Sequence, residues 1–204
     1  MNKMESTWGQ ASPAGFAALS MASLLIWADQ CGYMPAQNAP LVALMLIAAG
    51  MTQITTGVIE LKRGDTAEES LFFMMGCLFM LGPGLGVLFE TMHKVSLAPL
   101  LGWVNILLGI FLLIWGISFS KKPWVIFLIS PGGFLFLGLF GCTTAGIGPP
   151  ILKPIDGWIG FFFMCWAIYI IVHILGQEVG IHIPVGEPLR VPNKKRTKSG
   201  GGRG

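Results

Sequence analysis

Few polar side chains fall inside the long apolar runs of this 204-residue chain, and these few are the candidates for chemistry. Gln53 and Asn105 are amides, so each offers two hydrogen-bond donors and an acceptor. Either amide could bind a solute in a pore, and either could equally bond a neighbouring helix. Tyr169 and His173 lie in the last apolar run. The chemistry that these residues suggest is hydrogen bonding within a membrane.

Charged residues avoid the apolar runs. Glu60 and Asp29 fall at the ends of runs, where contact with solvent is expected. His173 could relay protons, because histidine titrates near physiological pH, or it could bond a nearby carbonyl. None of the 13 Lys and Arg residues lies inside a predicted span. This excludes a voltage sensor and a transporter that grips a carboxylate with a buried base.

Sequence signatures of catalysis are missing from the chain. We find no nucleophile triad, no H-E-x-x-H zinc helix, no phosphate-binding loop and no dinucleotide fingerprint. The glycine runs lack the strand, turn and helix that such motifs require. We therefore predict that the protein is not an enzyme, binds no cofactor or metal, and has no nucleic-acid partner.

The elements that must position these residues are membrane spans. Hydrophobic residues make up 53% of the chain and charged residues only 11%, whereas a soluble domain carries about 25% charged residues. About 20 apolar residues are needed to cross a bilayer as a helix. The sequence predicts an all-α, polytopic protein of the cell (inner) membrane with six transmembrane helices, at 13–29, 39–60, 70–90, 97–119, 124–141 and 157–177.

The basic residues indicate how these spans are oriented. With six spans both termini lie on one side, and that side holds eleven Lys and Arg residues against Lys94 and Lys153 on the other. Basic residues favour the cytoplasmic side, so both termini and the loop "ELKRGDT" are predicted to be cytoplasmic. We predict three regions: a short cytoplasmic N-terminus at 1–12, a transport domain at 13–180, and a basic, disordered cytoplasmic tail at 181–204, with membrane lipid as a partner.

Two spans contain residues that interrupt helices. Gly82-Pro83-Gly84 in the third span is expected to kink or break that helix, and Pro131-Gly132-Gly133 is expected to do the same in the fifth. Backbone groups freed in this way must be buried in protein or line a wet cavity. A kink that serves packing alone is the alternative.

Two blocks of the sequence resemble the acetate uptake transporter family, the succinate–acetate permeases. "TQITTGVIELKRGDT" resembles its second-span signature, with Gln53, Gly57, Glu60, Gly64 and Thr66 on the matching positions and Asp65 in place of Asn. "GWIGFFFMCWAIYIIVHILGQEVG" with "IPVGE" is similar to its last span and end, including Gly157 and Tyr169. The resemblance covers residues 12 to about 187.

The resemblance implies which residues line the solute path. The first-span motif Asn-Pro-Ala-Pro-Leu-Gly corresponds to "SPAGFA", which keeps its outline in Ser12, Pro13 and Ala14. The family's three-residue constriction would correspond to Met21, Met75 and Phe134. The resemblance also implies a homo-hexamer with one pore per subunit. Pro13 suits the first turn of a helix that Ser12 would cap, and that helix N-terminus could offer N–H groups to an anion.

We predict a channel or transporter for small monocarboxylates such as acetate, and also succinate, with or without coupling to protons. The predicted path comprises Ser12, Pro13, Ala14, Gln53, Glu60, Asn105 and Tyr169. A channel for a small neutral amide such as urea fits the same glycine-rich spans without buried charge. A membrane scaffold that transports nothing is the third hypothesis. The sequence alone leaves these alternatives open.

Overall fold

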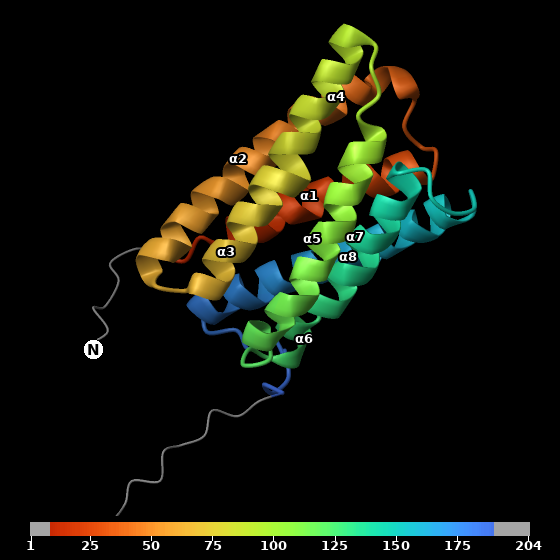
Figure 1. The fold of residues 1–204 in the computed structure, drawn as a ribbon. Helices are drawn as coiled ribbons and strands as arrows, with labels where there is room; N and C mark the ends of the chain where they lie inside the picture. The colour runs from red at the N-terminus through yellow and green to blue at the C-terminus, as the bar shows by residue number, and fades with distance from the viewer. Residues whose placement is uncertain (1–8, 190–204) are drawn as a thin grey trace, which may run out of the picture.

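Each long apolar run is helical in the computed structural model, which describes residues 9–189 (Figure 1). Helices suit these runs because a membrane offers the backbone no other hydrogen-bond partners. The elements in chain order are α1 (Ser12–Gln30), the short 3-10 helix η1 (Ala36–Asn38), α2 (Ala39–Arg63), α3 (Thr66–Met74), η2 (Met75–Leu81), α4 (Gly82–His93), α5 (Ala98–Phe119), α6 (Trp124–Phe127), α7 (Ile129–Thr144) and α8 (Leu152–Glu178).

The predicted all-α, polytopic membrane fold is confirmed. Within residues 9–189, five helical segments are long and apolar enough to cross a membrane, namely 36–63, 66–93, 98–119, 124–144 and 152–178. The 19-residue helix α1 is the sixth long helix, and its serines and Asp29 make it less apolar. Many large apolar side chains lie on the outer surface, among them Ile117 and Phe162, which are 67% and 68% exposed. Such a surface suits contact with lipid or with other subunits.

The six segments pack as a closed ring. α1 contacts α2, α2 contacts the segment formed by α3, η2 and α4, and that segment contacts α5. α5 in turn packs along α7, α7 contacts α8, and α8 packs along α1. Chain neighbours are therefore also neighbours in space, and the last segment closes the ring against the first. The start of α1, the α2–α3 turn and α6 gather at one end of this ring (Figure 1).

Both predicted helix interruptions occur, in different forms. In the third segment, a seven-residue π-helix, η2, directly precedes Gly82 and Pro83, and the helix then continues as α4. Proline has no N–H and cannot donate the regular helical hydrogen bond, and a wider π turn accommodates it. In the fifth segment the helix is broken at Leu128, between α6 and α7, three residues before Pro131. The predicted kinks therefore lie just upstream of each proline.

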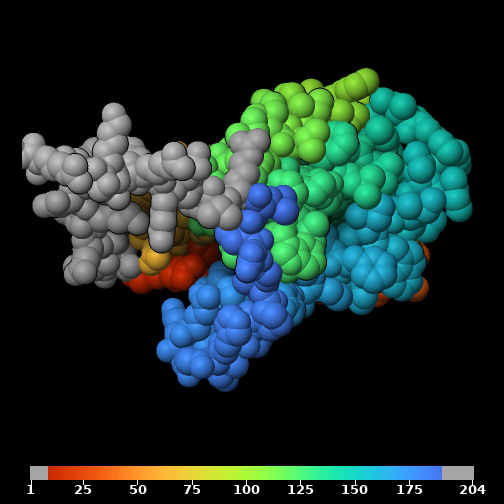
Figure 2. Space-filling model, turned by 90° about the horizontal axis from the view of Figure 1, so that it is seen from below, coloured from red at the N-terminus to blue at the C-terminus, as the bar shows by residue number. Residues whose placement is uncertain are grey.

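The chain after α8 corrects the predicted domain boundary. Residues 181–189, which we expected to begin a disordered tail, are held against α6. Trp124 N donates to Glu187 O and Val125 N to Val185 O, each at 3.2 Å, and Pro123 pairs with Pro188 in an isolated β-bridge. In the space-filling view the last described residues, in blue, lie against the green segment that contains α6 (Figure 2). The rest of the predicted tail, 190–204, lies outside the described residues, as do residues 1–8.

Candidate solute pathway

The N-terminus of α1 is capped by a carboxylate from another helix. Glu60, in the last turn of α2, accepts hydrogen bonds at Oε1 from the backbone nitrogens of Ala11 at 2.9 Å and Ser12 at 3.0 Å. Ser12 is the first residue of the helix and its side chain does not cap it, so the predicted serine cap is wrong. The free N–H groups of a helix N-terminus attract anions, and here the protein supplies the anion itself.

The hydroxyl of Ser12 lies between two carboxyl groups. Its Oγ is 3.0 Å from Glu60 Oε1 and 2.5 Å from Oε2 of Glu68, a residue of α3. Ser12 is fully buried, and Glu60 and Glu68 are only 2% and 9% exposed. A hydroxyl carries one hydrogen and can donate it to one acceptor at a time. Because Glu60 Oε1 already accepts from two backbone N–H groups, the shorter contact favours donation of the hydroxyl hydrogen to Glu68.

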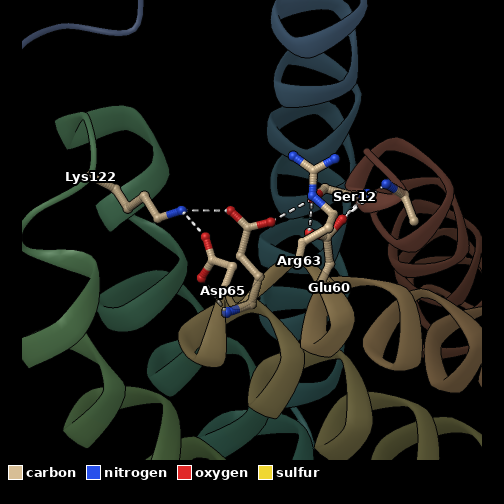
Figure 3. Close-up of polar contacts among 7 residues, drawn as sticks. Ser12, Glu60, Arg63, Asp65 and Lys122 are labelled. Carbon is tan, nitrogen blue, oxygen red and sulfur yellow. Dashed lines mark hydrogen bonds and ion pairs between the residues drawn. The ribbon is translucent and has the colours of Figure 1, made fainter. Parts of the chain in front are cut away.

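Further charged residues surround these two carboxyl groups and form an opening at one end of the ring (Figure 3). Arg63 pairs with Glu60 Oε2 at 3.0 Å, while Lys122 reaches Asp65 at 2.7 Å and Glu68 at 2.9 Å. The opening lined by these side chains has a volume of about 700 Å³. We call it the Glu60 mouth. At this mouth the ion pairs of Lys122 join the turn before α6 to the start of α3, and the hydrogen bonds of Ser12 join α1 to α2 and α3.

The ion pair at the edge of this mouth shifts the titration of both partners. Burial disfavours the charged form of Asp65, but the hydrogen bond and charge of Lys122 outweigh burial and lower the pKa of that carboxyl below 3.8. Burial likewise disfavours charged Lys122, but the charge of Glu68 and the bonds to both carboxylates raise its pKa above 10.5. Both groups are therefore charged throughout the physiological pH range.

Gln53 links three segments of the ring from within. Its side chain is fully buried, and Nε2 donates to the carbonyl of Gly15 on α1 at 3.1 Å. A Cβ added at Gly76 of η2 would lie 2.9 Å from the Cβ of Gln53, so no larger residue fits opposite it. The Oε1 atom is buried and has no hydrogen-bond partner within residues 9–189. One half of this amide is therefore bonded to a neighbouring helix, and the acceptor half is left unsatisfied inside the ring.

A second opening lies toward the other end of the ring. It is a cavity of about 210 Å³ with mostly apolar walls, and its polar lining residues include Asp29, Glu90, Asn105 and Thr144. The amide of Asn105 is 1% exposed and donates to Leu101 O at 2.9 Å, and its Oδ1 has no partner in the part of the chain that the structure describes. Ser12 and Asp29 are 17 residues apart on one helix, so the two openings are separated by about 25 Å.

Aromatic side chains fill the ring between the two openings. Phe16 of α1 contacts Phe72 of α3 and Trp166 of α8, with ring centroids 5.6 and 5.8 Å apart. Deeper in the ring, Phe136 of α7 contacts Phe79 of η2 at 6.1 Å and Phe163 of α8 at 5.6 Å. We call these rings the aromatic layer. The contacts of Phe16 with Phe72 and of Phe79 with Phe136 join segments that are not neighbours in the ring, so these side chains meet across its interior and close it.

The three residues predicted to form the constriction lie in different environments. Met75, the first residue of η2, is 2% exposed within the core, and Met21 is partly buried and packs against the same core. Phe134 is 40% exposed and faces away from the ring interior, whereas Phe136 is fully buried. The structure does not bring Phe134 to the two methionines, and Phe136 is the phenylalanine of α7 that fills the interior.

The remaining predicted path residues lie at the edges of the ring. Pro13 is half-buried and Ala14 exposed in the first turn of α1. The hydroxyl of Tyr169 donates to the carbonyl of Pro184, and His173 Nδ1 lies 2.9 Å from the carbonyl of Ile183. Both side chains thus hold the segment after α8, and His173 follows the simpler of its two predicted roles.

Two residues of the Glu60 mouth, Glu68 and Lys122, did not emerge from sequence reasoning. A local signal for Glu68 exists, because Asp65 and Glu68 have the spacing of a helix cap and its third residue, and Asp65 does accept a bond from Glu68 N at 3.2 Å. No local signal pairs Lys122 with Asp65. Residues 9–189 contain no group of three His, Cys, Asp or Glu side chains that could hold a metal ion.

Comparison with known proteins points to carboxylate transporters. The chain is 26% identical over 191 aligned positions to the succinate-acetate/proton symporter SatP of Escherichia coli K12, and equally to that of Shigella flexneri, covering 86% of this chain and 94% of each relative. The fold matches the structure of the bacterial acetate channel SatP with a TM-score of 0.78 at 23% identity, over 87% of this chain and 99% of that one. No protein-family model matches the chain.

Proposed function

We propose that this chain, which belongs to the acetate uptake transporter family, is a membrane channel or transporter for small monocarboxylates such as acetate. The relatives that it matches are named for acetate, succinate and protons. The proposed path runs from the Glu60 mouth past Gln53 and the aromatic layer to the cavity at Asn105. Because the aromatic layer closes this path, conduction requires its side chains to move.

The observation that carries this proposal is the carboxylate of Glu60 on the N-terminus of α1. Three hydrogen-bond donors, the backbone nitrogens of Ala11 and Ser12 and the hydroxyl of Ser12, surround its Oε1 within 3.0 Å. These donors form a receptor for a carboxylate oxygen, and Arg63, 3.0 Å from Glu60 Oε2, adds a positive charge beside it. A solute carboxylate would bind there when Glu60 moves away, so Glu60 acts as a tethered competitor of the solute.

Proton coupling is part of the proposal. A carboxylic acid with a pKa near 4.3 is about 0.2% protonated at neutral pH, so a transporter that moves acid and proton together must supply the proton. Glu60 and Glu68, which contact the hydroxyl of Ser12 at 3.0 and 2.5 Å, are the proposed groups that exchange a proton with the solute. Both carboxyl groups lie where the solute carboxylate would arrive.

A homo-hexamer with one path in each subunit also belongs to the proposal. The family resemblance implies this assembly, and the apolar outer surface of the ring can serve subunit contacts as well as lipid contacts. Cross-linking and mass measurement of the protein in native-like lipid discs would count the subunits. A monomer in all lipids would remove the hexamer while leaving the path within one chain intact.

Uptake of labelled acetate into proteoliposomes tests the function. We expect saturable uptake that unlabelled propionate or succinate reduces and that an inward proton gradient accelerates. Labelled urea in the same vesicles tests the neutral-amide alternative. Uptake of urea but not acetate would replace the proposal, and flux of neither solute through folded protein would favour a scaffold.

A further inference from the structure

A carboxyl group without any partner is buried near the start of α8. The side chain of Asp156 is 0% exposed, and neither Oδ1 nor Oδ2 accepts a hydrogen bond within the described residues. A buried ionised carboxylate is strongly disfavoured unless donors or cations compensate it. Asp156 lies at the end of the ring opposite to the Glu60 mouth, and the proposed path through Gln53 and Asn105 does not use it.

The last turn of α1 packs directly against this position. A Cβ added to the next residue, Gly157, would lie 2.7 Å from Cys31 Sγ and 3.1 Å from the Cβ of Gln30. The same turn carries two further buried polar atoms without a partner, Trp27 Nε1 and Gln30 Oε1. Among the described residues, the unsatisfied acceptors at the α1–α8 contact are the oxygens of Asp156 and Gln30 Oε1, and the unsatisfied donor is Trp27 Nε1. Acceptors therefore outnumber donors. One added hydrogen on Asp156 would supply a donor and remove the buried charge together.

The charges around Asp156 do not provide the missing compensation. Lys153, three residues earlier on α8, is in no ion pair with another residue of 9–189, and its charge acts on Asp29 at the exposed end of α1. Asp29 is the one charged residue of α1, and α7 has none. Residues 145–151 carry no charge either. Cys31, the other titratable group that interacts with Asp156, would add negative charge on ionisation and so favour the neutral acid.

We propose that Asp156 is a proton-binding site, which holds its proton as a neutral acid when the folded protein is at neutral pH. Neutral Asp156 can donate its hydrogen to a nearby acceptor such as Gln30 Oε1 after a small side-chain rotation, and Trp27 Nε1 can donate to its carbonyl oxygen. The proton is exchanged with water at this end of the ring. Its use in transport rests on the proposed function, whereas its presence on Asp156 does not.

Infrared spectroscopy tests the site directly and without any solute. The full-length protein in liposomes is compared with two variants. Asp156→Asn removes the buried carboxyl group of α8, and the control Asp29→Asn removes an exposed carboxyl group in the last turn of α1. We expect the carbonyl stretch of a neutral acid at neutral pH in the wild type, its loss in Asp156→Asn, and its retention in Asp29→Asn. The band should vanish reversibly at alkaline pH. Identical neutral-acid bands in wild type and Asp156→Asn would overturn the proposal.

Thermal unfolding gives an independent readout. Asparagine has the shape of the neutral acid and carries no titratable proton, whereas the unfolded aspartate releases its proton above about pH 4. Asp156→Asn should therefore unfold near the wild-type temperature at about pH 4 and above it at neutral pH. If Asp156 were instead ionised and compensated by Lys153, both Asp156→Asn and Lys153→Met would unfold at a lower temperature at neutral pH, which would contradict the inference.

Transport separates this inference from the proposed function. In proteoliposomes that take up acetate, the acceleration by an inward proton gradient should disappear in Asp156→Asn and persist in Glu178→Gln, which changes an exposed carboxyl of α8 outside the proposed path. An unchanged acceleration in Asp156→Asn would remove the coupling role while the infrared result still decides the site. Absence of acetate uptake in the wild type would count against the proposed function alone.

Discussion

Glu60 Oε1 lies 3.0 Å from both the backbone nitrogen and the hydroxyl oxygen of Ser12, although the two residues are 48 positions apart in the chain. This contact joins the end of α2 to the beginning of α1. It places a carboxylate on a helix N-terminus at one end of a ring of apolar helices. The site is thus assembled by the tertiary packing of residues that are distant in the sequence.

Ser12→Ala should destabilise the protein by about 1–3 kcal/mol, because it leaves two buried carboxyl groups without their shared hydroxyl. The matched control is Ser20→Ala, another buried serine of α1, whose hydroxyl donates only to Phe16 O in its own helix. Denaturant unfolding in detergent measures both. Equal losses in the two variants would mean that the hydroxyl of Ser12 has no special role at the mouth.

The ion pair of Lys122 with Asp65 should limit stability at both extremes of pH. The pKa of Asp65 is lowered from 3.8, so its contribution is present above that pH and is lost as the pH falls below it. The pKa of Lys122 is raised from 10.5, so its contribution is complete below that pH and is lost as the pH rises above it. Both side chains are about one-third exposed, so solvent screening limits the pair to roughly 1 kcal/mol.

Lys122→Met should therefore lower the unfolding temperature between these two pH values. It should also remove the part of the stability loss at acid pH that is due to the ion pair. Lys121→Met, at the exposed neighbouring position, should leave the pH profile of the wild type unchanged. Melting curves from acid to alkaline pH measure both variants. If the unfolding temperature falls equally at acid pH in Lys122→Met and in the wild type, the ion pair does not cause that fall.

Phe136→Ala should increase acetate uptake or make it less selective against larger acids, because it removes a fully buried ring from the aromatic layer. It should also cost about 3–5 kcal/mol of stability, so folding is checked at the assay temperature. Phe134→Ala, an exposed phenylalanine two positions away, should leave selectivity unchanged. The opposite pattern would place the constriction at Phe134, as the family resemblance implies.

Gly186→Ala should detach the segment after α8. The glycine has a positive φ of 74°, and an added Cβ would lie 1.8 Å from Trp124 Cδ1. Gly180→Ala is the matched control, since its φ of 77° carries the same backbone strain and no atom lies within 4 Å of the added Cβ. We expect a loss of about 1 kcal/mol in the control, from strain alone, and a clearly larger loss in Gly186→Ala. Proteolysis near residue 186 reports detachment.

The spans could be predicted from the sequence because hydropathy is a local property of about 20 consecutive residues. The two proline interruptions could also be predicted, because proline removes a hydrogen bond wherever it occurs. The cap of α1 could not, because the partner that outcompetes Ser12 comes from Glu60 on another helix. Phe134 and Phe136 could not be told apart either, because they lie two positions apart on one apolar helix and only tertiary packing makes one 40% exposed and the other 0%.

Asp156 illustrates how a boundary error hides a site. The predicted sixth span began at 157, which placed this carboxyl in a solvated loop. In the structure α8 begins at Leu152, and the extra turn carries Asp156 into the contact with α1. Lys153 and Pro154 make that turn less apolar, so the predicted span began after them. Hydropathy reports how apolar a stretch of sequence is and contains no information on tertiary burial.

The central claim is that small carboxylates pass through the interior of the helical ring beside Gln53. Its most direct test is the uptake of labelled acetate into proteoliposomes by Gln53→Ala and by Thr52→Ala, an adjacent exposed residue whose hydroxyl bonds only its own helix at Ala48. We predict that Gln53→Ala loses uptake while Thr52→Ala retains it, with both proteins folded to the same extent. Equal uptake by both variants would contradict a path along Gln53.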